Sequence, residues 1–151
     1  MLGHKILVAC IGNICRSPAA EGFIADYFQK NNISGEVASA GIHALVGESA
    51  APYTEKTMKT LYGIDVSHHR AQQLTEAIIK KYDVVFAMSD GQVRHLKKTY
   101  PHASGKICLL GKWQETDIGD PYRESEAVFQ ECIALIQVCT NDWLTRFWGK
   151  I

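Results

Sequence analysis

The sequence has 151 residues, 46% of them hydrophobic, and its 16 lysine and arginine residues balance 16 aspartate and glutamate residues. This size and composition are typical of one globular domain over residues 1–151, and they exclude disordered, collagen-like and disulfide-scaffold proteins. No apolar run reaches the roughly 18–20 residues of a membrane-spanning helix, and the apolar stretch at the N-terminus is too short for a signal peptide. We therefore expect a cytoplasmic protein without membrane insertion, and its neutral charge argues against nucleic acid as a partner.

Short apolar runs alternate with helical patterns along the chain. The runs predict buried strands over residues 5–10, 35–39, 83–88 and 106–110. Helices are predicted over residues 17–30, 52–62, 75–81, 89–100 and 125–147. Ser17 and Pro18 are expected at the N-cap and first position of the first helix, and Gly63 at the end of the second. Because the strands are apolar on both faces, we predict a single-domain α/β fold, a four-stranded parallel sheet with helices on both faces.

The loop between the first predicted strand and the first helix is the candidate site, because ligands of open parallel sheets bind beyond the carboxyl ends of strands. Gly12 and Asn13 tolerate left-handed backbone, so the loop can turn its amide groups inward as an anion nest. Arg16 adds a planar fork for two phosphate oxygens, and the helix N-terminus adds its positive dipole. Cys10, at the base of this cradle, would be stabilised as a thiolate and placed for in-line attack on phosphorus.

A leaving oxygen needs a proton, which a carboxyl group on another loop at the same sheet edge could supply. Asp117 and Asp120 are the candidates. We prefer Asp120, because Pro121 restrains it to extended geometry and Tyr122 can form the wall of an aromatic pocket. Taken alone, the Asp-Pro-Tyr triplet is equally compatible with a turn that starts a helix.

Four segments then point to a family: VACIGNICRSP from Val8, SAG from Ser39, HRAQQLT from His69 and DPY from Asp120. In this order and spacing they resemble the low-molecular-weight protein tyrosine phosphatases, over essentially the whole chain. The resemblance implies a four-stranded parallel α/β fold with a phosphate-binding loop after the first strand. It also implies hydrolysis of phosphotyrosine through a phosphocysteine intermediate, with no metal and no other cofactor.

The resemblance carries roles to individual residues. Cys10 is implied as the nucleophile, Arg16 as the arginine that binds phosphate and stabilises the transition state, and Asp120 as the general acid and then the base for water. The remaining matched positions are implied to form the phosphate-binding loop and its hydrogen-bond network: Ile11, Gly12, Asn13, Ile14, Cys15, Ser17, Ser39 and His69.

Three segments, SAGIHALVG from Ser39, LGKW from Leu110 and DPYRES from Asp120, resemble a bacterial branch of this family that is paired with tyrosine autokinases of capsule and exopolysaccharide export. This resemblance implies a phosphotyrosine protein as partner, the C-terminal tail of such a kinase, and we expect a monomer or weak oligomer. The substrate pocket is expected to include Leu45, Tyr122 and Arg123. Arg123 would place a cation at the pocket rim and so favour an acidic tail.

The five cysteines leave alternatives open. A thiol-coupled arsenate reductase shares the fold and the loop, but it needs two more cysteines for a disulfide relay, and none lies between Cys15 and Cys108. Cys132 and Cys139 lie on the apolar stripe of the last helix, which predicts a packing role. Cys15 is either a buried structural thiol or a partner for a reversible disulfide with Cys10.

Two other classes of protein fit this sequence less well. A structural zinc site would need cysteine and histidine residues at ligand spacing, which the sequence does not contain. A phosphocysteine carrier should lack the general acid and the arginine of the loop. A non-catalytic phosphoprotein-binding module should lack the loop cysteine. This chain has all three residues. The sequence therefore favours an enzyme.

Overall fold

A computed structural model describes residues 4–149 of the chain. Four parallel strands form one sheet in the order β2-β1-β3-β4. Their bounds are β1 Lys5–Cys10, β2 Glu36–Gly41, β3 Val84–Ala87 and β4 Ile107–Leu109. The strand count and the parallel pairing confirm the fold class predicted from the alternating apolar runs.

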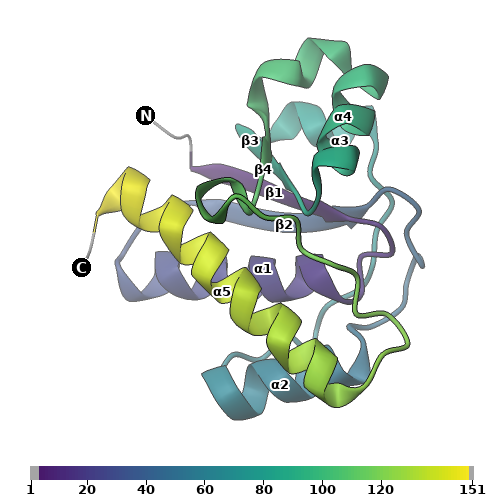
Figure 1. The fold of residues 1–151 in the computed structure, drawn as a ribbon. Helices are drawn as coiled ribbons and strands as arrows, with labels where there is room; N and C mark the ends of the chain where they lie inside the picture. Colours follow the sequence, from purple (N-terminus) through teal and green to yellow (C-terminus); the bar gives the residue numbers. More distant parts are fainter. Residues whose placement is uncertain (1–3, 150–151) are drawn as a thin grey trace.

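Helices cover both faces of the sheet (Figure 1). One face carries α1, α2 and α5, and the other carries α3 and α4. The bounds are α1 Arg16–Lys30, α2 Pro52–Tyr62, α3 Glu76–Lys81, α4 Asp90–Thr99 and α5 Glu126–Trp148. Two short 3-10 helices, which the sequence did not predict, lie at η1 Pro101–Lys106 and η2 Lys112–Gln114. No helix within residues 4–149 has the length and apolar character needed to cross a bilayer.

The central strand β1 explains why the core has two halves. Alternate side chains of a strand point to opposite faces of the sheet. Ile6 and Val8 belong to the core beneath α1 and α5, whereas Leu7 and Ala9 belong to the core beneath α3 and α4. Both halves exclude water from this strand, which is why its sequence is apolar throughout rather than alternating.

Most predicted helix ends agree with the structure. The side chains of Thr75, Ser89 and Ser125 each accept a hydrogen bond from an amide in the first turn of α3, α4 and α5. Gly63 ends α2 in the left-handed conformation with φ +67°, which glycine adopts without steric strain.

The prediction for the start of α1 was wrong. The helix begins at Arg16, with Cys15 at the N-cap position and no side-chain capping bond. Ser17 lies inside the first turn and Pro18 follows it, so neither residue has the position that the Ser-Pro pair indicated. The Ser17 hydroxyl bonds instead to Cys10 and Asn13, which leaves it unavailable as a cap.

The strand order places the loop after β1 at a crevice of the sheet. The chain leaves β1 for β2 on one side and then crosses to β3 on the other side. Ligands of such sheets bind beyond the carboxyl ends of the strands where the order reverses. The loop that follows Cys10 lies at this point.

Candidate active site

The loop of residues 10–15 turns its carbonyl groups outward. Each of the six carbonyl oxygens accepts a hydrogen bond of 2.6 to 3.2 Å from a surrounding segment. The donors are, in order, the amides of Ile42, His43 and Leu45, the Nε2 atom of His69, the amide of Ala51 and the hydroxyl of Thr54. By contrast, no backbone amide of residues 11–15 donates to another residue that the structure describes. The amides are therefore available to an anion held inside the loop.

Asn13 holds the loop in this curled shape. Its backbone is left-handed with φ +62°, a conformation that asparagine tolerates better than most residues. Its Nδ2 atom donates to Ser17 Oγ at 2.7 Å and to Ser39 Oγ at 2.9 Å, and its Oδ1 atom accepts from the Gln72 amide at 2.9 Å. Ser39 in turn donates to Glu21 Oε1 at 2.5 Å. The network thus connects the loop to α1, β2 and the segment before α3.

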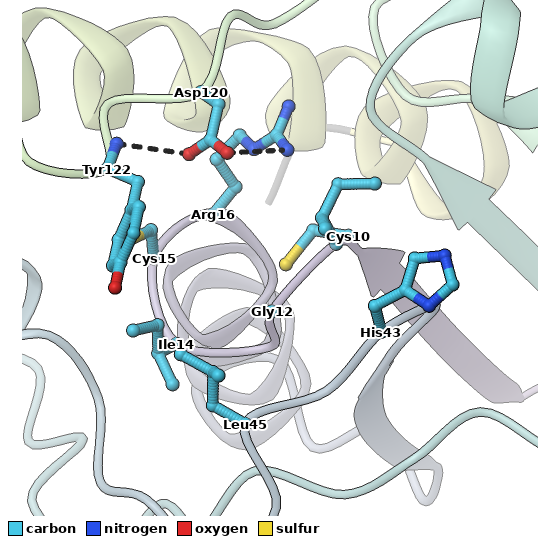
Figure 2. A pocket seen from close by; sticks show the side chains of 10 residues that line it. Cys10, Gly12, Ile14, Cys15, Arg16, His43, Leu45, Asp120 and Tyr122 are labelled. Atoms are coloured by element: carbon cyan, nitrogen blue, oxygen red, sulfur yellow. Dashed lines mark hydrogen bonds and ion pairs between the residues drawn. The ribbon is translucent and has the colours of Figure 1, made fainter.

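Cys10 lies at the base of the loop, with 2% of its surface exposed and its sulfur directed into the pocket (Figure 2). Its Sγ atom is 2.9 Å from Ser17 Oγ. Because Ser17 Oγ already accepts a hydrogen bond from Asn13, its own proton is free to be donated to the sulfur. Such a bond, together with the helix N-terminus beside it, directs positive partial charge toward the sulfur.

Arg16 directs its guanidinium group toward the segment that contains Ile118 and Asp120. The side chain is buried, its Nη1 atom donates to Ile118 O at 2.7 Å, and its Nη2 atom is 3.7 Å from Asp120 Oδ2. Its Nε atom is buried and has no hydrogen-bond partner among the described residues. Because a buried donor without a partner is unfavourable, the Nε and Nη2 edge could bind two oxygens of an anion.

Asp120 lies across the pocket from the floor of the loop (Figure 2). Its Oδ1 atom accepts from the Tyr122 amide at 3.0 Å, and its side chain is 46% exposed. The amide of Ile118 donates to Met88 O at 2.8 Å, which fixes this loop at the carboxyl end of β3. The other candidate acid, Asp117, accepts from the amide of Asp90 and does not line the pocket.

These groups meet in a pocket of about 160 Å³. It is lined by Cys10, Ile11, Gly12, Ile14, Cys15, Arg16, His43, Leu45, Asp120 and Tyr122. Ser17, Asn13, Ser39 and His69 lie behind it as the supporting network. Leu45 and Tyr122 line the pocket, whereas Arg123, which was predicted to place a cation at its rim, is not among the lining residues. Its backbone is left-handed with φ +65°, and its guanidinium carbon lies 5.1 Å from the centre of the Tyr122 ring, outside the pocket.

Sequence reasoning missed two residues of this region. His43 lines the pocket from the segment after β2, and its position just beyond a strand's carboxyl end was the available signal. Glu21 anchors the network through Ser39 and lies four residues after Ser17 on α1, so helical spacing could have indicated that both face the loop.

The geometry matches a known family. The family model described as "Low molecular weight phosphotyrosine protein phosphatase" matches residues 5–150. The chain belongs to this family. It is accordingly an enzyme, a phosphatase, which confirms the resemblance seen in the motifs around Cys10 and Asp120.

Individual relatives agree over nearly the whole chain. The low molecular weight protein-tyrosine-phosphatase Ptp of Acinetobacter johnsonii is 42% identical over 139 residues, covering 92% of this chain and 94% of the relative. The probable low molecular weight protein-tyrosine-phosphatase EpsP of Ralstonia solanacearum is 39% identical, covering 93% and 94%. The structure of Vibrio vulnificus Wzb in complex with benzylphosphonate is 36% identical with a TM-score of 0.88, covering 95% of this chain and 99% of that one.

Three other thiols of this phosphatase have raised pKa values, which make them poor nucleophiles. Burial, followed by the nearby Asp120 carboxylate, raises the pKa of Cys15 to about 12. Burial also raises the pKa of Cys132 and of Cys139 to about 11, so these three side chains are protonated at neutral pH. Cys139 is buried in the core, whereas Cys132 is only half-buried. Within residues 4–149, no three histidine, cysteine or acidic side chains gather as a metal site.

Proposed function

We propose that this phosphatase hydrolyses phosphotyrosine in proteins through a phosphocysteine intermediate on Cys10. The observation that carries the proposal is the set of unpaired donors around one sulfur. The amides of residues 11–15 and the buried Nε atom of Arg16 have no acceptor among the described residues, and all of these residues except Asn13 line the pocket that contains Cys10. A tetrahedral dianion would satisfy these donors and bring its phosphorus above the thiolate.

The first step is attack by the thiolate on phosphorus. The new S–P bond forms as the bond between phosphorus and the phenolic oxygen breaks, and the leaving oxygen takes a proton from Asp120. Arg16 and the loop amides stabilise the charge of the transferring phosphoryl group. The tyrosine leaves as a neutral phenol, and Cys10 carries the phosphoryl group.

The second step returns the enzyme to its starting state. Asp120, now a carboxylate, takes a proton from a water molecule as the water oxygen attacks phosphorus. The S–P bond breaks, inorganic phosphate forms, and the thiolate is regenerated while Asp120 is again in its acid form. The hydrogen bond from Ser17 favours this step, because it stabilises sulfur as a leaving thiolate.

The pocket walls support an aromatic substrate. Leu45 and Tyr122 present apolar surface between the pocket floor and solvent, at the depth where the ring of a phosphotyrosine would lie. Benzylphosphonate, the ligand named for the Vibrio vulnificus relative, has a benzene ring one carbon from its phosphorus and so resembles an aryl phosphate. A phosphoserine side chain lacks such a ring, so its peptide backbone would have to enter the pocket.

For the protein partner, we propose the phosphorylated tail of a bacterial tyrosine autokinase of polysaccharide export. The support is the resemblance of residues 39–47 and 110–113 to that branch of the family, together with relatives named EpsP and Wzb. Incubating the purified phosphatase with such a tail, phosphorylated on tyrosine, and measuring phosphate release would test this partner. Hydrolysis no faster than that of an unrelated phosphotyrosine peptide would refute it.

The mechanism is tested with aryl phosphates in the presence of a metal chelator. We expect turnover by the native protein, none by Cys10→Ser, and retained phosphate binding by that variant. Asp120→Ala should slow substrates with poor leaving groups most, because these depend most on protonation. An equal loss for all leaving groups would remove Asp120 from the acid role.

The same assays separate the reductase alternative. A disulfide relay would need two more thiols, and of the two half-buried thiols, Cys108 and Cys132, only Cys132 lies close enough to be influenced by Cys10. We expect Cys132→Ser to retain phosphatase turnover and the native protein to consume no thiol when arsenate is added. Thiol consumption that depends on arsenate and on Cys132 would favour the reductase.

A further inference from the structure

A second and larger depression adjoins the active-site pocket. Its volume is about 570 Å³, compared with about 160 Å³ for the pocket, and the two share Ile14 and Tyr122 in their walls. The depression lies between the segment leading into α2 and the start of α5, and we refer to it as the α2–α5 groove. Its lining includes Glu48, Tyr53, Tyr122, Arg123, Glu124 and Phe129.

The floor of the α2–α5 groove is aromatic and preformed. The rings of Tyr53 and Phe129 meet edge to face with 5.5 Å between their centres. Phe129 is buried, whereas Tyr53 is 40% exposed and presents its ring to the groove. An ion pair of 2.9 Å between Lys56 and Glu126 holds the starts of the two helices together. A flat apolar side chain could therefore bind here without rearrangement of the helices.

The charges at the rim of the groove disfavour acidic ligands. Glu48 and Glu124 line the groove, and neither carboxylate has an ion-pair partner among the described residues. The one cation, Arg123, already lies over the ring of Tyr122. An acidic side chain would meet two like charges, whereas an uncharged apolar side chain would meet none.

A further depression, on the other side of the pocket, leaves room for the second flank of a polypeptide substrate. It has a volume of about 370 Å³ and shares Ile11 and His43 with the pocket. Figure 2 shows Tyr122 and Ile14 on one side of Cys10 and His43 on the other. A chain that inserts a phosphotyrosine between them would lay one flank over the α2–α5 groove and the other over this smaller depression.

We propose that the α2–α5 groove binds an apolar, preferably aromatic, side chain of a residue that flanks the phosphotyrosine in the substrate protein. This inference rests on the proposed function and adds a specificity-determining surface to it. The small pocket accommodates only the phosphoryl group and ring, so recognition of the rest of the substrate falls to the neighbouring groove. Contact with Tyr53 and Phe129 would stabilise the transition state of such substrates and raise kcat/KM.

The test compares phosphotyrosine peptides that differ at one flanking position, with phenylalanine, alanine or glutamate at each of the three positions on either side. We expect one flank to prefer phenylalanine to glutamate by about tenfold in kcat/KM. Tyr53→Ala should reduce kcat/KM for the phenylalanine peptide about five- to tenfold and reduce the preference accordingly. Hydrolysis of 4-nitrophenyl phosphate, which does not reach the groove, should change less than about twofold.

Controls separate the groove from general effects on the fold. Leu61→Ala, at the other end of α2 and 57% exposed, should leave all substrates unchanged. Tyr53→Phe keeps the ring and should keep the preference. The inference is overturned by equal losses for peptide and aryl phosphate in Tyr53→Ala, by no loss at all, or by a preference for glutamate. Failure of the native protein to hydrolyse 4-nitrophenyl phosphate would instead contradict the proposed function.

Discussion

Substitution of Asn13 tests whether its hydrogen bonds shape the phosphate-binding loop. The side chain makes three hydrogen bonds of 2.7 to 2.9 Å, and the backbone is left-handed. Asn13→Ala removes all three bonds and leaves a residue that disfavours this backbone. Asn13→Gly removes the same bonds but tolerates the backbone. The difference between the two variants therefore isolates the backbone contribution.

The three hydrogen bonds of the Asn13 side chain determine how much stability its substitution should cost. Each buried hydrogen bond contributes about 1 kcal/mol, so losing all three lowers the free energy of unfolding by about 3 kcal/mol in Asn13→Gly. The left-handed backbone costs alanine about 1 kcal/mol more than glycine, so we expect a loss of about 4 kcal/mol in Asn13→Ala. This order is notable because glycine is normally the less stable replacement within regular structure.

Urea unfolding and aryl phosphate turnover measure the two consequences. Because Asn13 orients the Ser17 hydroxyl toward Cys10, kcat should fall about 10- to 100-fold in both variants. Asn32 is a matched control, since it is left-handed at φ +53° but exposed, and its side chain makes no hydrogen bond with the residues that the structure describes. Asn32→Ala should lose about 1 kcal/mol at most and keep its kcat. Native stability and turnover in Asn13→Gly would refute the role of the network.

Two further predictions concern glycine packing and pH. In Gly41→Ala the new Cβ atom would lie 2.6 Å from the carbonyl oxygen of Ile11, so the loop must shift and kcat should fall at least about tenfold. Gly63→Ala meets nothing within 4 Å and should only lose about 1 kcal/mol of stability; equal effects on turnover would contradict the argument. Burial raises the pKa of Cys139 from 9.0 to about 11, so the folded protein retains a proton that the unfolded chain releases, and stability should fall as pH rises from about 9 to 11. Urea unfolding at pH 8 and 10 should show a smaller fall in Cys139→Ala, and an unchanged fall would remove this thiol as a cause.

The amino-acid sequence determined the architecture because its signals are local. Apolar runs of four to eight residues predict buried strands, and the structure shortens two of them, giving Val84–Ala87 and Ile107–Leu109. Gly63, Thr75 and Ser125 act through their own backbone neighbours, so their roles at helix ends were also predictable. The spacing of Cys10 and Arg16 was predictable for the same reason, because the two residues lie at the two ends of one short loop.

The tertiary structure alone decided how distant side chains meet. Asp120 reaches the pocket because its loop is held beside β3, and the supporting bonds come from segments far apart in the chain. The hydroxyl of Ser17 was predicted as a helix cap because a Ser-Pro pair is locally suited to that role. In the structure this hydroxyl instead forms hydrogen bonds with the side chains of Asn13 and Cys10. Arg123 was expected in the pocket, but its left-handed backbone and the Tyr122 ring direct it to the neighbouring groove. Side-chain direction depends on packing between elements that are not neighbours in sequence, and no local pattern records it.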